Sequence, residues 1–367
     1  MARSIVGLGD SKAVKKFSGM LAVDVARDMY WERKFIGKGR TASAPIMQLT
    51  ELENDAGEQI TYDLSMQLTQ QPIEGDDVQE GTEEALRFFT DAVYIDQARG
   101  GVSGGGRMTR KRTLHNMRMV GKDRMAEWWA RMFDEQIFIY LSGARGINAD
   151  YIFPVGYTGR ANNAITAPDA YHLHVAGGHV KNTVVVGDVM TLAEIDKALV
   201  KAKTMGGGSQ GVPRIKPITI DGEKHFVVVM STQQAYDMRT ATGTGGWLDV
   251  QKAMATCEGK NSKIAKGGLG MHNNVFLHEH DAVIRFSDYG AGANVPAARA
   301  LLLGNQAGVL AYGSPGTGLR YDWHEESRDN GNEVVISSSC IFGFKKSTFN
   351  GLDFGLMAID TAAAAIA

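Results

Sequence analysis

The longest regular pattern of apolar positions in the chain lies at residues 107–143. Apolar side chains recur there three, four or seven residues apart, with one eight-residue step, which is the spacing of one helix face. They are Leu114, Met117, Met125, Trp128, Met132 and Ile139. Gly143 follows the last turn, where glycine commonly ends a helix. The pattern predicts one uninterrupted helix of roughly 50 Å at about 1.5 Å per residue, which suits a strut better than a pocket wall.

The residues before this helix follow other patterns. Residues 1–40 space several apolar residues as in a helix, which predicts a peripheral helix that another surface must cover. These are Phe17, Leu21, Val25, Met29 and Trp31. Residues 41–106 contain short strand-like runs, and residues 61–69 alternate in the manner of a half-buried strand. Tyr62, Leu64, Met66 and Leu68 are the apolar members, between Thr61, Asp63, Ser65, Gln67 and Thr69. We expect this region to be an extended arm without a core of its own.

The rest of the chain predicts an α+β protein. Residues 144–182 have an irregular composition rich in Gly, Asn, Ala and His. Thr191 and Glu194 have capping-box spacing and predict a helix that ends near Gly206. Two more helices are expected, one after Ser231 and Thr232 and one after Gly246. Strands are expected at 184–186, 226–230, 275–280, 333–340 and 354–359, with an apolar run at 300–303.

Composition and charge narrow the class of protein. The 367 residues include 39 basic and 41 acidic side chains, so no global field recruits nucleic acid or a membrane. The 44 glycines indicate many turns and close backbone contacts. Cys257 and Cys340 lie far apart and fit reduced thiols better than a disulfide framework. Without a signal peptide or a long apolar run, we expect a soluble protein made inside a cell.

Two glycine-rich stretches invite a nucleotide-binding interpretation. Residues 206–211 match the letters of GxGxxG, but they follow a helix and precede an extended segment, the reverse of a dinucleotide site. Residues 101–106 do precede a helix, yet Arg107 and Met108 replace the Lys-Ser/Thr of a phosphate loop. A flexible loop and a hinge are the favoured interpretations. The hinge residues are Gly100, Gly101, Gly104, Gly105 and Gly106.

Side chains that could carry chemistry are few. Five histidines could place imidazoles on a strand face as metal ligands: His172, His174, His179, His278 and His280. They have no neighbouring cysteine and no HExxH helix, so solvated or strand-edge histidines are favoured. Trp128 and Trp129 could stack on bases, but one of them on an amphipathic helix is more often core or interface. We predict no catalytic residue, no metal and no cofactor.

Two blocks of opposite charge are the remaining feature. The acidic block comprises Glu74, Asp76, Asp77, Glu80, Glu83 and Glu84. The basic block comprises Arg107, Arg110, Lys111, Arg112, Arg118, Lys122 and Arg124. Such blocks on two extended elements can orient identical subunits, although two solvated faces remain the alternative. The candidates for contact between subunits are the whole acidic block together with Arg110, Lys111, Arg112 and Arg118.

Several segments in this order resemble one family. They are 89–99 (FTDAVYIDQAR), 109–113 (TRKRT), 128–134 (WWARMFD), 141–146 (LSGARG), 296–307 (PAARALLLGNQA), 344–355 (FKKSTFNGLDFG) and 359–361 (IDT). They span nearly the whole chain. The sequence resembles the major capsid proteins of tailed phages related to phage N-four, which have the Hong Kong 97-like fold.

The resemblance implies an N-terminal arm at 1–40, an E-loop at 41–106, a spine helix at 107–142, peripheral residues at 143–182, an axial domain at 183–295 and a return to peripheral strands at 296–367. It implies pentamers and hexamers that form an icosahedral head around double-stranded DNA, assembled in the host cytoplasm. It also implies a portal, and it leaves scaffolding and decoration proteins open. Some members cross-link a Lys to an Asn, but no such pair can be assigned here.

Two alternatives stay open at this point. An encapsulin-like cellular compartment shares the fold and would package cargo enzymes. A dinucleotide-dependent enzyme would rest on residues 206–211 alone.

Overall fold

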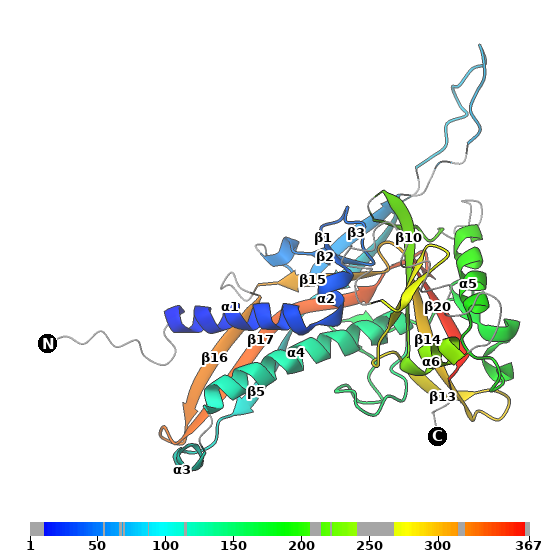
Figure 1. Ribbon diagram of the computed structural model, residues 1–367. Helices are drawn as coiled ribbons and strands as arrows, with labels where there is room; N and C mark the ends of the chain where they lie inside the picture. The colour runs from blue at the N-terminus through cyan, green and yellow to red at the C-terminus, as the bar shows by residue number, and fades with distance from the viewer. Residues whose placement is uncertain are drawn as a thin grey trace.

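A computed structural model gives the architecture of residues 11–53, 56–65, 68, 70–86, 88–113, 116–205, 214–220, 222–240, 268–314 and 320–363. The body is elongated, with a helix-and-sheet part at one end and a second sheet with its own helices at the other (Figure 1). A loop projects from the second end, well clear of the body (Figure 1). The predicted α+β class is confirmed.

The first part is built on a six-stranded sheet. Its strand order is β1 (Ile36–Lys38), β2 (Ile46–Leu49), β15 (Gly308–Gly313), β17 (Glu333–Lys346) and β16 (Tyr321–Arg328), and β5 (Asp96–Ser103) pairs with β17. The long β17 pairs with β15 and β16 in turn along one edge and with β5 along the other. Strands β2 and β5 belong to this sheet, so the projecting arm is shorter than the E-loop range 41–106.

The spine helix is not continuous, which corrects the prediction. A short helix α3 (Arg107–Arg112) ends at Thr113, whose backbone is extended, and α4 (Met117–Ser142) begins after Asn116. The Asn116 side chain accepts a hydrogen bond from the Arg118 backbone N–H at 3.2 Å. This N-cap satisfies a free donor of a new helix, which favours a restart over continuation. Helix α4 ends where predicted, at Gly143, which has the left-handed conformation (φ 68°).

Helix α4 packs on the six-stranded sheet through its aromatic side chains. Trp129 is fully buried, and its indole N–H donates to the Ser338 hydroxyl of β17 at 2.6 Å. Trp128 is partly buried against the same core. The ring of Phe133 lies 4.4 Å from that of Phe342. The prediction that one of the two tryptophans belongs to the core is therefore confirmed.

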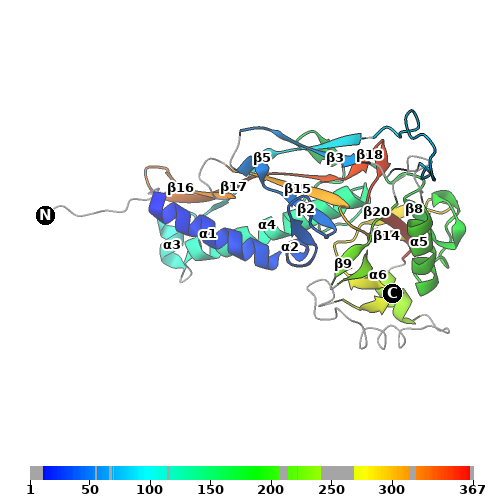
Figure 2. The ribbon, with the colours of Figure 1, turned by 90° about the horizontal axis from the view of Figure 1, so that it is seen from above.

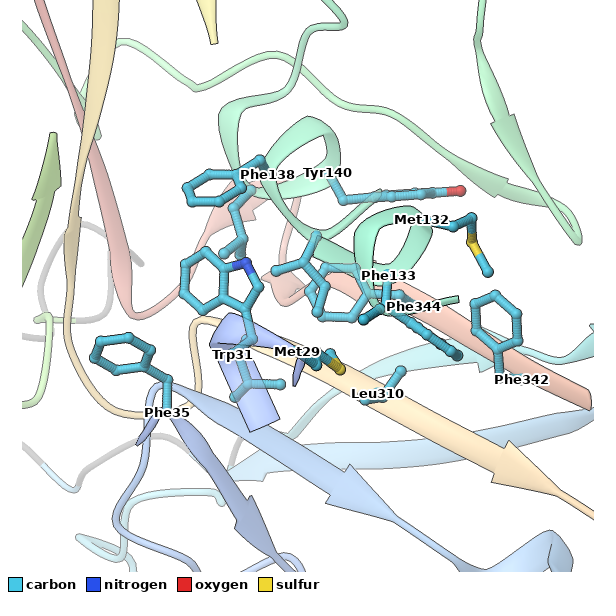
Figure 3. Close-up of a cluster of buried hydrophobic side chains, with 14 of the residues drawn as sticks. Met29, Trp31, Phe35, Met132, Phe133, Phe138, Tyr140, Leu310, Phe342 and Phe344 are labelled. Atoms are coloured by element: carbon cyan, nitrogen blue, oxygen red, sulfur yellow. The ribbon is translucent and has the colours of Figure 1, made fainter. Parts of the chain in front are cut away.

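The predicted N-terminal helix is present as α1 (Ser11–Asp28) and the short α2 (Tyr30–Lys34). Helix α1 lies alongside α4 and β16 (Figures 1 and 2). Leu21 and Val25 are buried there, and Met29, Trp31 and Phe35 continue into the aromatic cluster around Phe138 (Figure 3). Since these side chains are covered by α4 and the sheets, the helix is stabilised by surfaces outside its own segment.

The second part is an eight-stranded sheet. Its order is β11 (Gly270–His272), β12 (Val275–Glu279), β10 (Glu223–Met230), β14 (Val295–Leu303), β20 (Leu356–Ala362) and β8 (Leu173–Val175), with β13 (Arg285–Tyr289) on β14 and β9 (Ile218–Ile220) on β10. Helices α5 (Leu192–Thr204) and α6 (Thr232–Thr240) cover one face. The other face packs on the end of α4, so β10 and β14 are buried on both sides. That burial explains their continuous apolar runs.

Smaller elements complete the chain. They are β3 (Gln59–Ser65), β4 (Phe88–Tyr94), β6 (Gly159–Arg160), β7 (Asn163–Ala164), β18 (Thr348–Phe349), β19 (Leu352–Asp353) and the 3-10 turns Glu51–Glu53, Ala176–Gly178 and Lys181–Thr183. Residues 144–182 contain only such short pieces, so the predicted irregular segment is confirmed.

Most predicted elements of the second half are present, with two corrections. The strand expected at 184–186 is wrong: Val185 is exposed, and its backbone N–H is held by the Asp188 carboxylate at 2.8 Å in a turn. The boundary expected at 295/296 does not separate the two sheets, because β14 and β20 lie in the middle of the eight-stranded one. Residues 296–314 and 320–363 therefore contribute to both parts. The helix expected after Gly246 lies outside the described residues.

Candidate assembly surfaces

The arm begins as a two-stranded hairpin, β3 paired with β4. Ile60 and Tyr62 are buried and Thr61 and Asp63 are exposed, as the alternating pattern predicts. Their apolar side packs against Met47, Leu49, Val309, Ala311, Phe349 and Phe354 of the body. The pattern also predicts a buried Leu68, but this side chain is exposed. Met66 and Gln67 lie outside the described residues. The base of the arm is thus held by the body.

The outer part of the arm, residues 70–86, has no regular secondary structure. The Gln70 N–H donates to the Glu84 carboxylate at 2.8 Å, and the Glu84 N–H donates to the Gln70 side chain at 3.1 Å. The Gly81 N–H donates to Glu83 at 2.8 Å. Glu84 is half-buried and the other acidic residues of the block are exposed: Glu74, Asp76, Asp77, Glu80 and Glu83. Ile73, Val78 and Leu86 are exposed apolar side chains on the same segment.

The basic block lies at the opposite end of the body from the arm (Figures 1 and 2). Lys111 and Arg112 are exposed on α3. Arg110 donates to the Asn332 carbonyl at 2.9 Å, and Arg118 contacts Glu325 at 2.6 Å, so both are partly engaged within the chain. Lys122 is buried, and its ammonium nitrogen lies 2.7 Å from the Asp24 carboxylate. This ion pair joins α4 to α1. The two blocks therefore cannot meet within one chain.

The glycines predicted as a hinge lie between sheet and helix. Gly100 and Gly101 are inside β5, paired with Ser338 and Ser337 of β17. A Cβ on Gly100 would come within 2.8 Å of the Trp128 ring, so packing already requires glycine there. The Gly104 N–H donates to the Val334 carbonyl at 2.7 Å. Gly105 has φ +68°, and Gly106 is the residue before α3. The hinge role remains a prediction, and it falls on residues 104–106.

Three of the five candidate histidines are held by carboxylates. His172 contacts Asp169 at 2.8 Å, His174 contacts Glu194 at 2.8 Å and His179 contacts Asp188 at 2.7 Å. His278 is buried in β12, and His280 packs on Tyr30 with 4.3 Å between ring centres. Glu194 also shows that only half of the capping box forms: its N–H donates to Thr191, while its carboxylate binds His174.

Three further observations concern metal ligands, membrane-spanning helices and the cysteines. Among the described residues, no group of three or more His, Cys, Asp or Glu side chains is arranged to hold a metal ion. No helix in the described part of the chain is long and apolar enough to cross a membrane. Cys340 is a buried free thiol, whose pKa is raised by burial. Cys257 and residues 206–211 lie outside the described residues.

Sequence reasoning missed two buried polar sites that hold the body together. Asp134 of α4 accepts the Tyr30 N–H at 3.0 Å and the Trp31 N–H at 3.4 Å, at the start of α2. Burial raises the pKa of this carboxyl to about 7. Arg299 and Asp360 form a buried ion pair between β14 and β20. In each case the signal was a charged residue inside an apolar run, which requires a partner.

A projecting arm, a spine helix across one sheet and a second sheet on the end of that helix define the Hong Kong 97-like class of capsid subunit. The model of the phage capsid protein family matches residues 5–365, and this chain belongs to that family. The chain is 47% identical to the capsid of Ralstonia phage GP4, with full coverage of both chains and a TM-score of 0.86.

Two further matches are more distant in sequence. A major capsid protein of Pseudomonas phage KPP25 is 25% identical over 355 residues, covering 89% of each chain. The capsid of cyanophage Pam1 is 19% identical, with a TM-score of 0.70 over 90% of this chain and 91% of that one. The family match places this chain in the phage head shell as a major capsid protein, and it favours neither an encapsulin nor a dinucleotide-binding enzyme.

Proposed function

We propose that copies of this chain form the pentamers and hexamers of an icosahedral head that encloses double-stranded DNA, and that the chain has no catalytic activity. The observation that carries the proposal is the arm. Residues 70–86 project from the body and expose apolar and acidic side chains that nothing in the described chain covers. Exposed apolar side chains on an extended segment favour contact with another molecule. Neighbouring subunits are the partners that a shell provides.

The two ends of the body support a repeated contact. The acidic arm and the basic α3 lie at opposite ends, so a contact between them joins one copy to the next (Figure 2). Contacts of this head-to-tail kind close into rings when the rotation between copies closes. A portal, scaffolding or decoration proteins and non-specific contact of the inner face with DNA belong to the same proposal.

Electron microscopy of the purified protein tests the proposal. Expressed alone or with the neighbouring phage proteins, the chain should form capsomers or closed shells. A stable monomer at high concentration with those partners present would contradict it. A portal and a terminase gene nearby would support the phage head, and a cargo-enzyme gene would support the encapsulin alternative.

A further inference from the structure

Lys346 and Asp353 form a buried pair beside the β18–β19 hairpin. Lys346 is the last residue of β17, and Asp353 is the last residue of β19. The Lys346 Nζ lies 2.7 Å from the Asp353 Oδ1, and the two side chains are only 2% and 4% exposed. The chain between them turns back at Asn350 and Gly351, which both have positive φ. Folding therefore brings an amine and a carboxyl group into contact away from water.

The hydrogen bonds of Lys346 fit a neutral amine. Within the described chain its Nζ has two acceptors, the Asp353 carboxyl at 2.7 Å and the Thr166 carbonyl at 2.9 Å. A neutral amine has two N–H groups, whereas an ammonium group has three. Burial lowers the pKa of Lys346, and this effect outweighs the opposite effect of Asp353. The neutral amine that results keeps a free lone pair on its nitrogen.

The Asp353 carboxyl group has one oxygen with a partner and one without. Oδ1 contacts Lys346, while Oδ2 is buried and has no hydrogen-bond partner among the described residues. Such an oxygen is costly on an ionised carboxylate. Burial raises the pKa of Asp353 and outweighs the opposite effect of Lys346, and the charge of Asp169 raises this pKa further. The Asp169 carboxylate accepts the Asp353 N–H at 2.8 Å, so its charge is held close by.

We propose that the side chains of Lys346 and Asp353 join in an amide bond within one chain. The Nζ lone pair attacks the Asp353 Cγ, and the Nζ–Cγ bond forms as the Cγ–Oδ2 bond breaks. Oδ2, which carries the carboxyl proton, takes one proton from Nζ and leaves as water. The amide N–H that remains keeps the Thr166 carbonyl as its acceptor. The reaction removes the oxygen that lacks a partner, and it needs no reagent beyond two groups already in contact.

The bond closes a ring around the β18–β19 hairpin, which supports the base of the arm. Phe349 of this hairpin packs on Tyr62 of β3, with 5.8 Å between ring centres. Phe354, the residue after Asp353, belongs to the same apolar cluster. The amide bond therefore fixes the surface on which the arm is seated. The inference concerns a single chain, so it stands or falls independently of the proposed shell function.

The mass of the denatured full chain tests the proposal. The linked chain is lighter than its sequence by one water molecule. Trypsin locates the loss, because it cuts after Lys but not after an acylated Lys. No Lys or Arg follows Lys346 in the sequence, so the unlinked chain gives the peptide 347–367 and the linked chain gives 346–367 without one water. The full sequence mass together with peptide 347–367 would overturn the inference and leave the two side chains as an ion pair only.

The neighbouring lysine provides a matched control. Lys345 contacts one oxygen of Asp91, but the other oxygen accepts from Tyr62 and Thr348, and the Lys345 side chain is 22% exposed. We therefore expect no amide bond at Lys345. Lys346→Arg should abolish the loss of water, and Lys345→Arg should retain it. A water loss that persists in Lys346→Arg would contradict the assignment, and the unaltered chain decides the question by itself if that variant fails to fold.

Discussion

Arg299 and Asp360 face each other across β14 and β20 and form a buried, two-pronged ion pair. The Arg299 Nε and one terminal nitrogen donate to the two oxygens of Asp360 at 2.6 and 2.7 Å. The other terminal nitrogen donates to the Ser142 carbonyl, the last residue of α4, at 2.8 Å. The pair therefore fastens the end of the spine helix to the middle of the eight-stranded sheet.

Removal of one partner of this pair should destabilise the subunit strongly. Asp360→Ala leaves the Arg299 guanidinium buried without its counter-charge, which costs about 3–5 kcal/mol. Asp288→Ala is the matched control, because its pair with Lys181 is exposed and such pairs contribute about 0–1 kcal/mol. Urea unfolding of free subunits measures both. Similar losses in the two variants would contradict a special role for the buried pair.

Asp134 should make stability depend on pH. Its pKa is raised from 3.8 to about 7 chiefly by burial, so the folded chain binds a proton that the unfolded chain releases between these values. Stability then falls as pH rises from about 4 to about 7 and is level above that. The Asp134→Asn side chain cannot ionise. The free energy of unfolding of this variant, relative to that of the unaltered chain, should therefore increase as pH rises from about 4 to about 7. Urea unfolding of both proteins at pH 5 and pH 7.5 measures this difference in free energy. The same difference at the two pH values would contradict the prediction.

The outer arm should be ordered by neighbouring subunits. Residues 70–86 form no strand pairing, and ordering each residue costs roughly 1–2 kcal/mol of backbone entropy. Their amide hydrogens should exchange quickly in free subunits and slowly in shells. Residues 335–342 of β17, which are paired along both edges, serve as the internal control and should be protected in both states. Equal protection of the arm in both states would show that it needs no neighbour.

Opposite charges on the arm and α3 should control assembly more than subunit stability. Asp76, Asp77 and Glu80 can be changed to Lys without touching Glu83 and Glu84, which bind the arm's own backbone. The triple reversal should slow assembly, and the effect should shrink at high salt because exposed charges are screened. Lys111→Glu and Arg112→Glu in the same chain should restore part of the rate. If they slow it further, the two blocks do not meet.

Gly105 is the position within residues 104–106 whose backbone itself calls for glycine. Its φ of +68° disfavours any residue with a Cβ, whereas Gly100 is needed for contact with Trp128. Gly105→Ala should impair closure of shells and leave the circular dichroism of the subunit unchanged. Gly156→Ala, where a Cβ meets open space, is the control. Normal shells from Gly105→Ala would remove the hinge role.

The local elements and, through motifs in a fixed order, the family could be predicted from the amino-acid sequence alone. The spacing of Leu21, Val25 and Met29, the capping Thr191 and the stop at Gly143 all report structure within a few residues of themselves, because helix periodicity and end caps are local. The alternation of Tyr62 with Thr61 and Asp63 likewise predicted the strand and its buried face. These signals need no knowledge of the partner surface.

How the elements combine could not be predicted from the sequence, because it depends on contacts between distant residues. The break at Thr113 to Asn116 depends on a side chain that satisfies a new helix start, and the apolar residues at 184–186 became a turn because Asp188 holds Val185. Residues 296–363 divide between two sheets, and Arg299 finds Asp360 sixty-one positions away. Such pairings are non-local, so each residue's own neighbourhood in the chain carries no record of its partner.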